Sequence, residues 1–109
     1  MRKILITFIF VLLLFGCTKN EDVYDLIKKN EYVVIDVRSK QEYDSSHVKG
    51  AINIPYNQID DNLDIDKKKM ILVYCKSGTR SNIAYNKLKK QGFNVYDLGS
   101  IDNVELPVE

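Results

Sequence analysis

The sequence predicts an α/β fold, a small parallel β-sheet with helices on both of its faces. Two segments, residues 32–37 and 69–75, are nearly continuous runs of β-branched and other apolar residues, which is the pattern of strands buried on both faces. Segments with helical spacing alternate with these strands and with two shorter ones. Because alternating strands and helices form βα units, the sheet should be parallel and covered by helices.

After a first helix, the expected elements follow the order β-α-β-α-β-α-β. In residue numbers they are a helix within 21–32, a strand at 32–37, a helix at 39–47, a strand at 51–55, a short helix at 56–65, a strand at 69–75, a helix at 81–93 and a strand at 94–99. The first helix carries Val23, Leu26 and Ile27 at helical spacing, with acidic residues near its N-terminal end.

Caps and a proline mark the elements in the middle of the chain. Ser39 lies three residues before Glu42, which is the capping-box pattern of a helix start. Pro55 has no N–H group to donate to a neighbouring strand, so the short strand should end there. The helix that follows is expected to turn Ile59 and Leu63 toward the core.

The helix in 81–93 and the strand before it define the candidate site. Ile83, Ala84 and Leu88 recur at helical spacing, lysines lie in the last turn, and Gly92 is expected as the C-cap. In parallel sheets, ligands bind beyond the carboxyl ends of the strands, in the loops that lead into helices. Cys75 ends a buried strand at a position of this kind.

The composition is that of one soluble domain. The chain has 109 residues, of which 45% are hydrophobic and 28% charged, and its formal net charge is +1. Phosphate backbones bind to concentrated basic patches, whereas the lysines here are spread along the chain. We therefore expect no nucleic-acid partner, and the sequence leaves the oligomeric state open.

The first 16 residues have the pattern of a secretory signal peptide. A short basic start precedes the apolar run Ile4–Phe15, and the polar run Thr18–Asp22 follows soon after. A membrane-spanning helix needs about 20 apolar residues, so an uncleaved anchor is the weaker alternative.

The end of the apolar run, Leu14–Cys17, resembles the bacterial lipobox. The resemblance implies that Cys17 carries diacylglycerol and becomes the mature N-terminus, and the alternative is a cysteine that merely ends an apolar segment. Two or three acyl chains hold a protein at a membrane firmly, whereas one does not. The expected organisation is a signal peptide at 1–16, a lipid-anchored tether at 17–22 and an extracytoplasmic domain in the bacterial cell envelope at 23–109.

The chain has two cysteines, Cys17 and Cys75. If Cys17 carries the lipid, Cys75 has no disulfide partner in the chain. Most free cysteines are simply small buried apolar residues. Here, however, a short loop with Gly78 follows the strand, and its N–H groups can turn toward the sulfur. The helix that begins near Arg80 or Ser81 adds its positive N-terminal end, so the pKa of Cys75 should be lowered.

Three segments together resemble the single-domain sulfurtransferases of the rhodanese type. They are VIDVRSKQEYDSSHVKGAINIP at 34–55, VYCKSGTRSNIA at 73–84 and GFNVYDLGSI at 92–101. The resemblance implies that Cys75 is the nucleophile, which takes a sulfane sulfur from a small sulfur-containing anion such as thiosulfate and passes it to cyanide or a thiol acceptor. It implies no cofactor, and it implies that the substrate is bound by the loop residues Lys76, Ser77, Gly78, Thr79, Arg80 and Ser81.

The length of the cysteine loop separates this chemistry from that of related phosphatases. Arg80 lies five positions after Cys75, whereas phosphatases of similar fold have a longer loop that encloses a tetrahedral phosphate. The shorter ring suits a sulfur atom better. Two alternatives stay open: a persulfide carrier, sensor or redox-partner docking domain without turnover, and a phosphatase or arsenate reductase.

The remaining motif residues of the resemblance are expected to be structural. They are Asp36, Arg38, Glu42, His47 and Gly50. An ion pair between Arg38 and Glu42 would stabilise the helix that follows the first strand. His47 should lie in a turn before Gly50, away from the cysteine, and with one histidine and one available thiol no metal site is expected.

Overall fold

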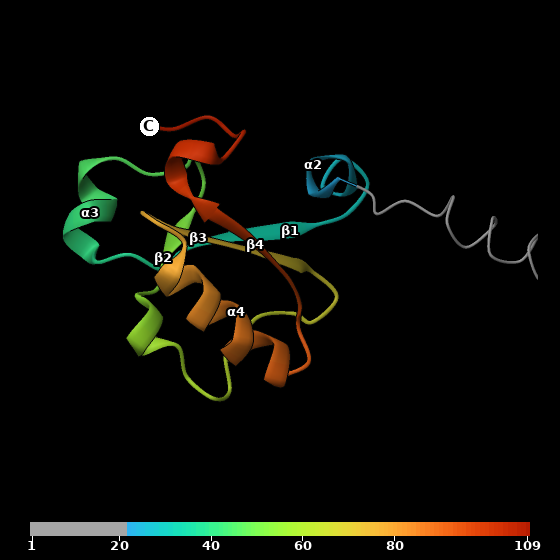
Figure 1. The fold of residues 1–109 in the computed structure, drawn as a ribbon. Helices are drawn as coiled ribbons and strands as arrows, with labels where there is room; N and C mark the ends of the chain where they lie inside the picture. Colours follow the sequence, from blue (N-terminus) through green and yellow to red (C-terminus); the bar gives the residue numbers. More distant parts are fainter. Residues whose placement is uncertain (1–21) are drawn as a thin grey trace, which may run out of the picture.

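The computed structural model describes residues 22–109, which form a four-stranded parallel sheet covered on both faces (Figure 1). The strands are β1 (Tyr32–Asp36), β2 (Ile52–Asn53), β3 (Met70–Cys75) and β4 (Asn94–Ser100), in the order β2-β1-β3-β4. Every neighbouring pair is parallel. The expected fold class is confirmed.

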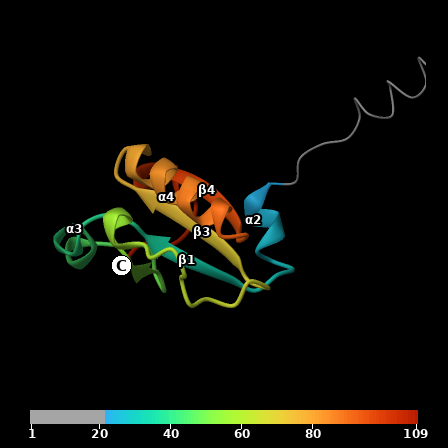
Figure 2. The ribbon, with the colours of Figure 1, turned by 90° about the horizontal axis from the view of Figure 1, so that it is seen from below.

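The helices are α2 (Val23–Leu26), α3 (Lys40–Ser45) and α4 (Thr79–Lys90), with two 3₁₀ turns, η1 (Tyr56–Gln58) and η2 (Ile101–Asn103). α4 lies alongside β3 and β4 on one face of the sheet (Figure 2). α2, α3 and the segment around η2 pack on the opposite face.

β3 is the centre of the core, and all six of its residues are buried. Side chains of a strand alternate between its two faces. Ile71, Val73 and Cys75 therefore pack with Leu88 of α4, while Leu72 and Tyr74 belong to the cluster on the other face. Cys75 thus points toward the side of the sheet that α4 covers.

The prediction of a helix at 56–65 is wrong, because only the 3₁₀ turn η1 forms there. Ile59 is buried as expected, and Leu63 is partly buried. Between them lie three residues, Asp60 to Asn62, whose side chains favour turns over helix interiors. Gln91, at the end of α4, holds this loop by accepting from the Leu63 N–H at 3.0 Å and donating to the Asp60 carbonyl at 2.7 Å.

Several element ends also differ from expectation. α2 has only four residues and starts after Asp22, whose carboxylate accepts from the Tyr24 N–H. The α3 capping box of Ser39 and Glu42 is present, although the helix ends at Ser45. α4 begins at Thr79 and its C-cap is Gln91, so Gly92 is the residue after the cap, with a φ of 90°.

The expected signal peptide and the lipidated Cys17 lie outside the described residues. Within residues 22–109, no helix is both long and apolar enough to cross a membrane.

Candidate active site

Cys75 lies at the carboxyl end of β3, between the sheet and the start of α4. A three-residue loop, Lys76–Gly78, joins the two elements. The loop can be this short because Gly78 adopts a φ of 100°, a backbone conformation that side chains disfavour. The cysteine itself is fully buried, and it is the free cysteine of the described chain.

The loop and the first turn of α4 direct their N–H groups at the sulfur. The Gly78 N–H donates to Sγ at 2.9 Å and the Ser81 N–H donates at 3.3 Å. The Ser81 side chain is also fully buried, with Oγ 3.5 Å from Sγ and 3.1 Å from the Gly78 carbonyl. This is the ring of inward-facing donors expected from the sequence.

These donors favour the charged form of the sulfur. Burial by itself raises the pKa of the Cys75 thiol, but the Ser81 hydroxyl and the N–H groups of Ser81, Gly78 and Ser77 stabilise the thiolate. Their combined effect exceeds that of burial, so the pKa of Cys75 is lowered. The sulfur is therefore prepared to act as a nucleophile.

Arg80 is held beside the loop by Glu42 of α3. The guanidinium donates from Nη1 to Oε1 at 2.7 Å and from Nη2 to Oε2 at 3.1 Å. The Arg80 hydrogen bonds lower the pKa of Glu42 to about 2, and hydrogen bonds from Ser39 contribute further. Glu42 in turn raises the pKa of Arg80, and the nearby Cys75 adds a smaller contribution of the same sign.

The prediction of an ion pair between Arg38 and Glu42 is wrong. Arg38 instead pairs with the buried carboxylate of Asp36, with Nη2 2.7 Å from Oδ2, and donates to the Ser46 carbonyl at 2.6 Å. Residues two apart on an extended segment lie on the same side of the chain, so Asp36 is the nearer partner for Arg38. Glu42 is thereby left to bind Arg80.

Tyr74 completes this buried polar network, although nothing in the sequence singled it out. Its hydroxyl donates to Asp36 Oδ2 at 2.7 Å and accepts from the Val48 N–H at 2.9 Å. Burial, above all, raises the pKa of Tyr74. A tyrosine in the middle of an apolar strand gives no sequence signal that its hydroxyl will meet a carboxylate on the neighbouring strand.

His47 and Gly50 lie in the turn that leads to β2. The His47 ring stacks on Tyr43, and its Nδ1 is 2.8 Å from the Tyr43 carbonyl. Its Nε2 lies 3.4 Å from Glu109. Gly50 has a φ of 83°. These contacts join α3 to the last residues of the chain and do not involve the cysteine loop.

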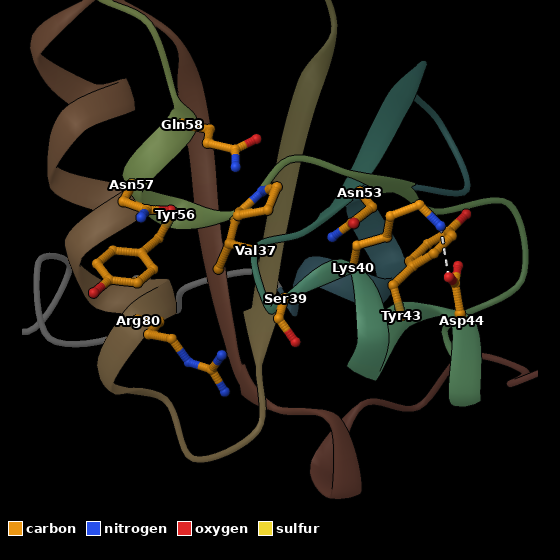
Figure 3. A pocket seen from close by; sticks show the side chains of 11 residues that line it. Val37, Ser39, Lys40, Tyr43, Asp44, Asn53, Tyr56, Asn57, Gln58 and Arg80 are labelled. Carbon is orange, nitrogen blue, oxygen red and sulfur yellow. Dashed lines mark hydrogen bonds and ion pairs between the residues drawn. The ribbon is translucent and has the colours of Figure 1, made fainter.

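Two hollows flank the pair of Glu42 and Arg80. One, of about 710 Å³, is lined by residues of α3, β2, η1 and by Arg80 (Figure 3). The other, of about 470 Å³, is lined by Glu42 and by Lys76, the exposed residue that follows the cysteine. Among residues 22–109, no group of three or more histidine, cysteine or acidic side chains is placed to hold a metal ion.

Comparison with protein families matches residues 19–105 to the Rhodanese-like domain. The chain belongs to the rhodanese-like family. A rhodanese with anions from E. coli has the same fold, with a TM-score of 0.66 and 31% identity over 72% of this chain and 96% of that one. A Staphylococcus saprophyticus structure, SSP1007, has a TM-score of 0.65 and 27% identity over 84% of this chain and 99% of that one.

Small curated relatives also belong to this rhodanese-like family. Thiosulfate sulfurtransferase GlpE of Coxiella burnetii is 33% identical over 79 residues, which are 71% of this chain and 74% of that protein. Thiosulfate sulfurtransferase PspE of Escherichia coli is 34% identical over 77 residues, which are 67% of this chain and 74% of that protein.

Longer relatives share only this domain. The match to a probable molybdopterin-synthase adenylyltransferase of Porphyra purpurea is 40% identical over 68 residues, 60% of this chain and 18% of that protein. A second long relative, adenylyltransferase and sulfurtransferase uba4 of Ogataea parapolymorpha, is matched over 22% of its length. The chain thus spans about a fifth of each of these two proteins.

Proposed function

We propose that this protein is a rhodanese-type sulfurtransferase that moves a sulfane sulfur through a persulfide on Cys75. The observation that carries the proposal is the set of N–H groups, from Gly78 and Ser81, that donate to Sγ at the end of a buried strand. The names of GlpE and PspE, both thiosulfate sulfurtransferases, support this assignment.

In the first step, the Cys75 thiolate attacks the outer sulfur of a donor such as thiosulfate. A bond forms between Sγ and that sulfur, the S–S bond of the donor breaks, and its electron pair leaves with sulfite. In the second step, cyanide or a thiolate attacks the outer sulfur of the persulfide, and the electron pair of the broken S–S bond returns to Sγ. No external oxidant or reductant is needed.

The loop residues have distinct roles in this scheme. The N–H groups of Ser77, Gly78 and Ser81 stabilise the negative sulfur before and after transfer. Lys76 is exposed and attracts an anionic donor, while Thr79 opens the helix whose positive end faces the sulfur. Arg80 contributes less charge than the sequence suggests, because Glu42 neutralises much of it.

Turnover with thiosulfate and cyanide tests the proposal. The full-length protein, purified in detergent, should produce thiocyanate over many cycles, and Cys75→Ser should produce none. A lack of thiocyanate from a folded wild-type protein would refute the enzyme assignment.

A persulfide carrier without turnover is the second candidate. One relative of this chain, YrkF of Bacillus subtilis, is a putative sulfur carrier protein that is 34% identical over 61 residues, and the complete burial of Cys75 would protect a held sulfur. Stoichiometric persulfide on Cys75 without repeated transfer to cyanide or any thiol would favour this function.

We further propose that the domain is anchored on the outside of a bacterial membrane through a lipid on Cys17. The support is the apolar run Ile4–Phe15, followed by a small residue and the cysteine. Labelling with a radioactive fatty acid should mark the wild-type protein in the membrane fraction. Unlabelled wild-type protein, or labelled Cys17→Ala, would contradict the anchor.

A further inference from the structure

The edge strand β4 contains one extra residue at the level of the cysteine loop. In the pairing of β4 with β3, Val73 is the partner of Asp97. The next residue of β3, Tyr74, is the partner of Gly99, so Leu98 is left out of the register. Two residues of one strand thus stand opposite one residue of the other, which is a β-bulge. Bulges are rare between parallel strands and are over-represented next to active sites.

The bulge lies beside the cysteine loop. Because it moves the register by one residue, the partner of Cys75 is Ser100 and not Gly99. The Cα of Gly99 lies 3.8 Å from the position that a Cβ of Gly78 would occupy, which is an ordinary van der Waals distance. The backbone of β4 therefore approaches the loop closely at Gly78.

The side chain of Asp97 holds the bulge in shape. Its Oδ1 accepts from the Gly99 N–H at 2.9 Å, so the carboxylate joins the residue before the bulge to the residue after it. A hydrogen bond from an aspartate to the N–H two residues on competes with the regular strand ladder. Gly99 has a φ of 79°, a conformation that glycine adopts more readily than other residues.

The bulge is the place where the Asp97 side chain acts. Asp97 is exposed, and among residues 22–109 its carboxylate forms no ion pair and accepts no other hydrogen bond. The carboxylate is therefore not part of the buried polar network on the other strands. Its structural effect reaches the rest of the protein through the Gly99 backbone.

The cysteine loop depends on accurate placement. The Gly78 N–H donates to Sγ at 2.9 Å and the Ser81 N–H donates at 3.3 Å. The strength of such bonds depends steeply on their geometry. Three residues join β3 to α4, and two of them, Lys76 and Ser77, are exposed. The close approach of Gly99 thus restrains the third, Gly78.

We propose that Asp97 is a positioning residue for sulfur transfer, because it holds the β4 bulge against Gly78 and so keeps the loop N–H groups directed at Cys75. The proposal rests on the sulfurtransferase function above and adds a residue from the edge strand of the sheet. Asp97 touches neither the sulfur nor a substrate. It acts on the negative sulfur through the donors that stabilise it.

Alkylation of Cys75 by iodoacetamide tests the proposal, because it measures the thiolate without any sulfur donor. The full-length protein in detergent is alkylated over a range of pH, and the peptide that contains Cys75 is followed by mass spectrometry. Asp97→Ala should slow alkylation at pH 7 about threefold and move the profile to higher pH, since a displaced loop loses part of one hydrogen bond to the sulfur. Asp97→Asn keeps an oxygen that can accept from the Gly99 N–H and should retain the wild-type profile.

Asp66 provides the matched control. It is exposed, and its Oδ1 accepts from the Lys68 N–H, also two residues on, at 2.9 Å. Asp66 precedes β3, whereas Cys75 is at the other end of that strand. Asp66→Ala loses the same type of hydrogen bond and should leave the alkylation profile of Cys75 unchanged. A merely structural role for Asp97 would leave the profile unchanged in both variants.

A change at Gly99 tests the bulge by a second route. Gly99→Ala adds a methyl group that meets no atom within 4 Å, but the φ of 79° becomes strained. This variant should shift the profile in the same direction as Asp97→Ala. Gly50→Ala, with a φ of 83° and equally open surroundings, should not shift it. Urea unfolding shows which variants are folded under the conditions of the assay.

The failures of the two proposals are distinguishable. If the wild-type protein forms no persulfide with thiosulfate, the sulfurtransferase function fails, whatever the alkylation profiles show. If folded Asp97→Ala keeps the wild-type profile, only the positioning role is refuted. Should Asp97→Ala not fold, an unshifted profile of folded Gly99→Ala refutes that role.

Discussion

Glu42 and Arg80 lie 38 positions apart in the sequence, yet their side chains form a two-point ion pair beside the cysteine loop. The same Glu42 carboxylate accepts from the Ser39 N–H as part of the α3 capping box. One side chain thus joins the start of α3 to the start of α4. The position of Arg80 depends on a helix that follows a different strand.

Replacing Glu42 should therefore affect both stability and its pH dependence. Glu42→Gln should lower the free energy of unfolding at neutral pH by about 1 to 2 kcal/mol, since the pair is only partly exposed. The folded-state pKa of Glu42 is about 2, below its ordinary value of 4.5. The stabilisation is therefore complete above about pH 4.5 and is lost as the pH falls through 2.

Urea unfolding at a series of pH values checks this prediction. The curves of wild type and Glu42→Gln should converge as the pH approaches 2. Glu105→Gln, at an exposed position, is the control and should follow the wild type throughout. A difference that persisted unchanged at pH 2 would mean that the ion pair is not its source.

Ser81 should set the reactivity of Cys75. Ser81→Ala removes a hydroxyl 3.5 Å from the sulfur, so the pKa of Cys75 should rise toward its ordinary value. Alkylation by iodoacetamide at pH 7 should slow by about threefold to tenfold, which corresponds to the loss of one hydrogen bond of typical strength. The pH profile of alkylation measures this directly, and an unshifted profile would show that the backbone N–H groups suffice.

Replacing Gly78 should lower both the stability of the protein and the reactivity of Cys75. An alanine there would meet no close atom, since the nearest is 3.8 Å away, but the φ of 100° would strain the backbone. We expect Gly78→Ala to cost about 1 to 2 kcal/mol of stability and to displace the N–H that donates to Sγ. Gly50→Ala has similar strain far from the cysteine. Both variants should lose stability, but only Gly78→Ala should lose alkylation rate.

The Tyr74 hydroxyl should stabilise the buried network without being part of the reaction. Tyr74→Phe leaves the buried Val48 N–H without a partner and removes one of the hydrogen bonds to Asp36 Oδ2, which should cost about 1 to 3 kcal/mol. Tyr96→Phe, on the same face of the sheet, is the control. Thermal unfolding measures both. If Tyr74→Phe and Tyr96→Phe were equally stable, the Tyr74 hydroxyl would not stabilise the fold.

Much of the fold was predictable because the strongest signals are local. The buried pattern of β3, the capping box of Ser39 and the glycine of the cysteine loop each depend on neighbouring residues. The failed helix at 56–65 shows the limit, since Gln91 binds that loop from the far end of α4.

Part of the candidate site was likewise predictable from the sequence, and part was not. The direction of the loop N–H groups toward Cys75 follows from a short loop before a helix. The partner of Glu42 does not, because the sequence suggests Arg38, four positions away, whereas only the fold brings Glu42 of α3 beside Arg80 at the start of α4.

The mass of the intact protein after incubation with thiosulfate tests the central claim most directly. The account predicts that the protein gains one sulfur atom, that cyanide removes it, and that Cys75→Ala gains nothing. A wild-type mass that stays unchanged across a panel of sulfur donors, or a gain that persists in Cys75→Ala, would contradict it.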